Sequence, residues 1–123
     1  MSKKYKVIFW SSFNHVDTVT LCVSEKAYNK KCKKLGYDYT LNGSDGICTL
    51  FSRVGKRSEC VIGIKSINDK LENLLPLITH EIVHAADFIM EEDNIKDMEF
   101  RAYVVQDMLA KSILYIQELK VLK

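Results

Sequence analysis

Hydrophobic and polar residues alternate over short distances in the first half of the chain and recur at helical spacing in the second. In the first half, four short runs are rich in β-branched and aromatic residues and end in polar or glycine-containing segments, which is typical of strands. These predicted strands cover residues 5–10, 17–23, 46–53 and 58–65. Only residues 54–57 separate the last two, so we expect a hairpin there. Ser24 and Gly36 bound a polar segment and predict a short helix over 25–35.

The second half predicts two helices joined by a polar connection. Apolar residues recur three or four positions apart over 73–90 and 97–119, and residues 91–96 between them are polar. Pro76 suits the first turn of a helix, so the first helix is expected to start at 73 or 74. This order of elements predicts one α+β domain over residues 1–123. We expect a small mixed or antiparallel sheet of about four strands, packed on these two helices.

The composition is that of a globular protein, with 47% hydrophobic and 28% charged residues. No apolar run approaches the length of a membrane-spanning helix, and the N-terminal residues lack the apolar stretch of a secretory signal. We therefore expect a soluble, cytoplasmic protein with no membrane partner. The four cysteines include no Cys-x-x-Cys pair, so free thiols are expected rather than a thiolate zinc site or a redox motif.

Charge is divided unevenly along the chain, although the net charge is only +2. Residues 1–66 carry 12 Lys and Arg against 5 Asp and Glu, whereas residues 67–123 carry 6 against 11. The densest basic stretch is 26–34, which we interpret first as the solvated face of a helix. Because the whole chain is nearly neutral, nucleic acid is only a minor alternative partner for this basic half.

The segment His80-Glu81-Ile82-Val83-His84 carries the most specific chemistry, because it has the H-E-x-x-H pattern inside a predicted helix. Residues four apart lie one above the other on a helix, so both imidazoles point to the same side and are able to bind one Zn²⁺ ion. Glu81 lies about 100° round the helix from His80, close enough to hold a water on that metal and accept its proton.

A catalytic zinc site usually has three protein ligands, and the best third candidate is Glu99. It lies fifteen residues after His84, and Ala102 one turn further on allows the two helices to approach closely. Tyr103 lies on the same face as Glu99 and is a candidate hydrogen-bond donor to an oxyanion at the metal, or alternatively an aromatic residue packed between the helices. Arg101 is expected to pair with acids of the connection.

Four other residues are rival ligands with more ordinary roles. Asp87, at +3 from His84, is expected to hydrogen bond to His84 or to a neighbouring basic group. Asp93 and Asp97 are interpreted first as a loop acid and a helix cap. His15 lies in a polar segment and is expected to be exposed.

The pattern His80-Glu81-x-x-His84 followed by Glu99-x-x-Ala102-Tyr103 resembles the gluzincin branch of the zincin metallopeptidases. More narrowly, residues 73–110 resemble small metallopeptidase-like proteins encoded by tailed bacteriophages and prophages. The resemblance implies that His80, His84 and Glu99 bind zinc and that Glu81 is the base, although the spacing from His84 to Glu99 is shorter than in large gluzincins. It also implies a minimal zincin-like sheet whose edge strand directly precedes the active-site helix, at 60–65.

These features predict a zinc-dependent hydrolase, most simply a metallopeptidase acting on a protein or peptide. Two alternatives use the same residues differently. One is a catalytically weak or inactive zincin-fold module that docks on a host protein or nucleic acid through the basic half. The other is a structural zinc domain in which a fourth protein ligand closes the site.

Overall fold

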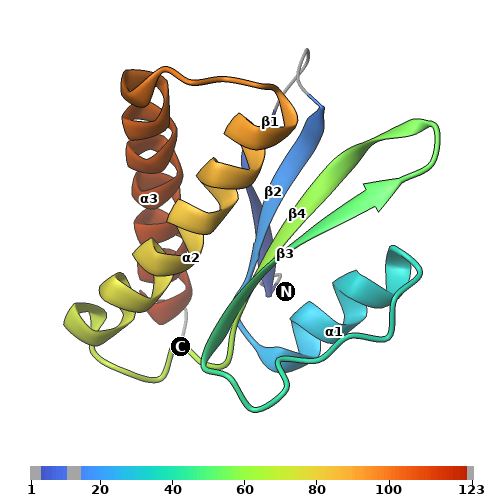
Figure 1. The fold of residues 1–123 in the computed structure, drawn as a ribbon. Coiled ribbons are helices and arrows are strands. Elements are labelled where there is room, and N and C mark those ends of the chain that lie inside the picture. Colours follow the sequence, from blue (N-terminus) through green and yellow to red (C-terminus); the bar gives the residue numbers. More distant parts are fainter. Residues whose placement is uncertain (1–3, 11–14, 122–123) are drawn as a thin grey trace.

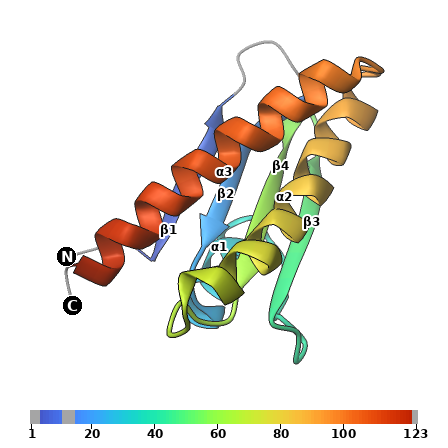
Figure 2. The ribbon, with the colours of Figure 1, turned by 90° about the vertical axis from the view of Figure 1, so that its left-hand side faces the viewer.

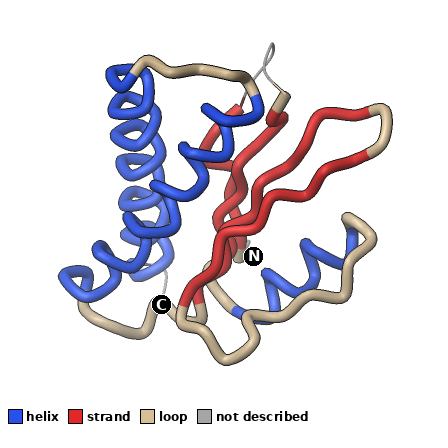
Figure 3. Tube along the Cα trace, in the orientation of Figure 1, coloured by secondary structure: helices blue, strands red, loops and turns tan. Residues whose placement is uncertain are grey.

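A computed structural model of the chain describes residues 4–10 and 15–121. Its centre is a four-stranded sheet with the order β1-β2-β4-β3 (Figures 1 and 3). The outer pairs β1–β2 and β3–β4 are antiparallel, and the central pair β2–β4 is parallel, so the sheet is mixed. The strands are β1 (Tyr5–Trp10), β2 (Val16–Cys22), β3 (Gly46–Arg53) and β4 (Lys56–Ile64).

The helices cover the two faces of the sheet unequally. α1 (Glu25–Lys34) packs on one face, while α2 (Leu71–Glu92) and α3 (Met98–Val121) pack on the other (Figure 1). α2 lies beside β3 and β4, and α3 crosses towards β1 (Figure 2). Among the described residues, no helix has the length and apolar character that crossing a bilayer requires.

Side chains of β4 alternate between two hydrophobic clusters because successive residues of a strand point to opposite faces. Cys60, Ile62 and Ile64 face the cluster under α2 and α3, whereas Val61 belongs to the cluster under α1. Gly63 also faces α1, where a Cβ atom would lie only 2.5 Å from the ring of Tyr28. This close approach is the reason for a glycine inside a buried strand.

The predicted α+β class, the order of elements and the hairpin are confirmed. The hairpin turn is tighter than expected, since β4 begins at Lys56 and only Val54 and Gly55 lie between the strands. Gly55 has a φ of 70°, a left-handed conformation that glycine adopts at little cost. The short helix α1 also matches its prediction. The side chain of Ser24 caps its N-terminus by accepting a hydrogen bond from the backbone N–H of Ala27.

Two predictions about the chain around α2 are wrong. The edge strands are β1 and β3 rather than β4, which directly precedes α2, because the parallel pairing of β4 with β2 encloses β4 within the sheet. α2 begins at Leu71, so Pro76 lies in its second turn rather than its first. The helix tolerates the proline there because the carbonyl left without its N–H partner is that of exposed Glu72.

Candidate metal centre

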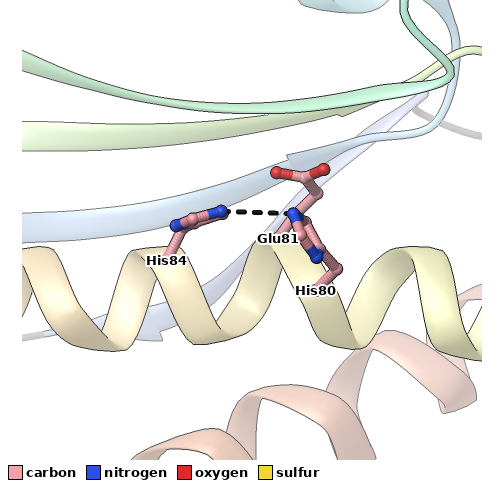
Figure 4. A group of neighbouring side chains, drawn as sticks. All are labelled: His80, Glu81 and His84. Atoms are coloured by element: carbon pink, nitrogen blue, oxygen red, sulfur yellow. Dashed lines mark hydrogen bonds between the residues drawn. The ribbon is translucent and has the colours of Figure 1, made fainter.

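Helix α2 brings His80 and His84 together as the motif predicts. Both side chains are exposed, and their Nε2 atoms lie 3.2 Å apart. The two rings meet edge to face, with centroids 4.8 Å apart and an interplanar angle of 78°. Figure 4 shows both imidazoles rising from the side of α2 that faces the strands, with Glu81 beside them.

The spacing of the two imidazole nitrogens suits a tetrahedral zinc ion. Two nitrogens bound at about 2.0–2.1 Å with a tetrahedral angle between them are separated by about 3.3 Å. The observed Nε2–Nε2 distance of 3.2 Å is close to this value. Ligand atoms of His80, Glu81 and His84 all lie within 4.8 Å of one another, and in the described part of the chain this is the one group of three or more such residues.

Glu81 differs from the two histidines because it is buried, with only 6% of its surface exposed. Its carboxylate lies between α2 and the start of β3, where a Cβ atom on Gly46 would be 3.2 Å from Oε2. Burial raises the pKa of the Glu81 carboxyl above its ordinary value, while His80 and His84 partly oppose that shift. A carboxylate with a raised pKa is a better proton acceptor near neutral pH than an exposed one.

The structure does not place Glu99 within this group. α2 extends to Glu92, so the connection is short and α3 begins beyond the end of α2. The first turn of α3 therefore lies beside Asp87 rather than beside the histidines, and Glu99 is exposed there. Tyr103 is 66% exposed and thus does not pack between the helices.

The rival residues take mostly the ordinary roles predicted for them. Asp87 pairs with Arg101, whose Nε lies 2.7 Å from Oδ1, so Arg101 reaches α2 rather than the connection. Asp97 caps α3 by accepting a hydrogen bond from the backbone N–H of Glu99 at 2.9 Å. His15 is exposed, and its Nδ1 lies 2.7 Å from a carboxylate oxygen of Asp93.

Sequence reasoning missed the part that β3 plays in the site. A Cβ atom on Gly46 would lie 2.9 Å from Leu77 Cδ1 as well as close to Glu81, so the absence of a side chain there leaves room for the carboxylate. The only signal in the sequence was a glycine at the start of a predicted strand, which often marks a close approach of another group.

Comparisons with known proteins identify no relative of this chain. No family model, no curated protein and no solved structure matches the chain.

Proposed function

We propose that the protein is a zinc-dependent hydrolase, most simply a metallopeptidase. The observation that carries this proposal is the pair of imidazole nitrogens 3.2 Å apart with the buried Glu81 carboxylate next to them. The same three residue types at this helical spacing serve zinc peptidases, and the resemblance of residues 73–110 to gluzincins supports the assignment.

The three residues have separate roles in the proposal. His80 and His84 would hold the metal, and a bound zinc would supply Lewis acidity towards a carbonyl and lower the pKa of a water molecule. Glu81 accepts the proton of the attacking water and returns it to the leaving amine. Its burial between α2 and β3 holds the carboxylate beside the histidines, which is the positioning that such a base requires.

Strand β3 is the element that we expect to hold an extended peptide. The backbone N–H of Lys65 donates to the carbonyl of Asp45, so the alternation of an antiparallel pair directs the backbone groups of Gly46, Cys48 and Leu50 away from β4. These groups lie at the free edge next to Glu81. A peptide added there would gain main-chain hydrogen bonds beside the metal.

The experiment that tests the proposal measures metal content and hydrolysis in the same preparations. Wild-type protein is expected to hold about one zinc per chain, and His84→Ala is expected to lose it. Glu81→Gln should keep the zinc while hydrolysis of a casein or peptide-library substrate falls by about 10²–10⁴-fold, because only the proton acceptor is removed.

Glu72→Gln, on the exposed first turn of the same helix, is the matched control and should retain full activity. Equal activity of Glu81→Gln and wild type would overturn the mechanism. Glu99 stays a predicted third ligand, and a Glu99→Gln variant with unchanged zinc affinity would remove it from the ligand set.

A second candidate function is a binding module of the phage-type effector class. One observation favours it: Tyr37 and Tyr39, which follow the basic helix α1, are partly exposed and pack against Phe51 with ring centroids 4.9 and 5.6 Å away. Exposed tyrosine rings beside a basic helix suit the binding of an acidic protein or a nucleic acid. Salt-sensitive binding that is indifferent to Glu81→Gln, without any cleavage, would favour this function over the hydrolase.

A further inference from the structure

Two cysteine side chains are in contact on the face of the sheet that α2 covers. Cys48 of β3 and Cys60 of β4 have their Sγ atoms 3.3 Å apart. Cys60 is fully buried, while Cys48 is half-buried on the edge strand. Both belong to the hydrophobic cluster under α2, and neither has a role in the proposed hydrolysis.

The register of the hairpin explains why the two thiols meet. Cys48 lies opposite Ile62 and Cys60 lies opposite Leu50, so the cysteines are diagonal neighbours. Diagonal neighbours of an antiparallel pair share a face of the sheet, and here both cysteine side chains turn towards each other until their Sγ atoms are 3.3 Å apart. The remaining cysteines, Cys22 and Cys32, belong to the cluster under α1 on the other face of the sheet.

We propose that Cys48 and Cys60 form a reversible cross-strand disulfide that fastens the edge strand β3 to β4. The two thiols lose two electrons and two protons, and the sulfur atoms approach from 3.3 Å to the bond length of about 2.05 Å. A disulfide oxidant such as oxidised glutathione accepts both electrons and both protons and leaves as two reduced glutathione molecules.

The bond would act on the strand that borders the metal centre. Gly46, two residues before Cys48 on the same face, approaches the Glu81 carboxylate. The disulfide therefore restricts β3 next to Glu81 without altering His80 or His84. It also constrains the unfolded chain, because it closes a loop through the hairpin.

Burial and the contact between the thiols affect the rate of this reaction rather than its outcome. The hydrogen bond with Cys60 and desolvation raise the pKa of the Cys48 thiol, so little thiolate is present at neutral pH. Oxidation is expected to be slow at pH 7 and faster in alkaline buffer. The test therefore needs equilibration over hours.

The test equilibrates the native full chain with excess oxidised glutathione at pH 8, followed by alkylation and mass spectrometry. Free thiols should fall from four to two, the intact mass should fall by 2 Da, and the linked peptides should contain Cys48 and Cys60. The melting temperature should rise by about 5 °C or more and return after reduction. Zinc content should not change, so this outcome is independent of whether the protein is a hydrolase.

Two variants separate this pair from the other cysteines. Cys48→Ser should keep all three remaining thiols reduced and show no thermal shift on oxidation. The double variant Cys22→Ser, Cys32→Ser should still form the bond. Four free thiols after equilibration of natively folded protein, or a bond mapped to any other pair, would overturn the proposal.

Discussion

Glu81 and the two histidines occupy one helical turn yet have opposite environments, and that difference suits their proposed roles. The histidines are exposed and free to receive a metal, whereas Glu81 is buried against the start of β3. Burial is possible because Gly46 presents no side chain to the carboxylate. At the scale of single residues, the position of the proposed base therefore depends on a glycine in a different element.

Replacing Gly46 with alanine tests this dependence. The new Cβ atom would lie 2.9 Å from Leu77 Cδ1 and 3.2 Å from Glu81 Oε2, so both side chains must move. We expect unchanged zinc content and hydrolysis that is lower by roughly tenfold or more, because small displacements of a catalytic group are costly.

Gly63→Ala is the contrasting control for that measurement. Its Cβ atom would lie 2.5 Å from the ring of Tyr28 on the opposite face of the sheet. This variant should lose about 1–3 kcal/mol of unfolding free energy while its folded molecules stay fully active. A Gly46→Ala protein as active as wild type would show that the carboxylate does not need this space.

At the scale of elements, helix α2 carries the candidate site in its central turns and a destabilising proline near its start. Its central turns carry the H-E-x-x-H motif, and its buried residues, including Ile78, Ile82 and Ile89, pack on the sheet and α3. Near its start, Pro76 interrupts the hydrogen-bond ladder within the helix. The packing of the following turns holds the helix despite this interruption.

Replacing Pro76 with alanine is expected to stabilise the protein. Restoring a helical N–H and removing the ring clash should raise the unfolding free energy by about 1–2 kcal/mol, after subtracting the entropy that proline removes from the unfolded chain. Urea denaturation measures this change. Pro76→Gly should give a smaller gain, because glycine is about 1 kcal/mol less favourable than alanine in a helix. Destabilisation by both substitutions would indicate that packing of the proline ring matters more.

At the scale of the whole molecule, ionisable side chains are buried on both faces of the sheet. Burial raises the pKa of Cys22 to about 12 from 9.0 and that of Tyr115 to about 12 from 10.0. The Cys22 thiol and the Tyr115 phenol therefore hold their protons more tightly in the folded protein than in the unfolded chain. Their contribution to stability is therefore complete below pH 9 and is lost as the pH rises towards 12.

Alkaline pH is accordingly expected to lower the melting temperature, beginning near pH 9. Cys22→Ala should cost about 1 kcal/mol at neutral pH through the space it leaves, but it should make the decline above pH 9 less steep. Melting curves recorded from pH 7 to 11 check this. Parallel declines in the variant and in wild type would show that Cys22 contributes nothing to the alkaline transition.

Much of the fold followed from local patterns. The bounds of β1 and β3 agree with their predictions, the cap of α1 was identified from Ser24, and the hairpin was expected from its short polar turn. The close approach of the two imidazoles also followed from the sequence, because helical periodicity alone brings residues four apart together. Each of these features is set by residues close to one another along the chain.

Long-range pairing decided the rest, because it depends on contacts that no short segment specifies. The parallel pairing of β2 with β4 leaves β3 at the edge of the sheet next to α2, and it is β3 that brings Gly46 to Glu81 and Cys48 to Cys60. The short connection from α2 to α3 places Glu99 beyond the histidines. Local spacing thus determined which side chains share a helical turn, whereas the packing of strands and helices determined what surrounds them.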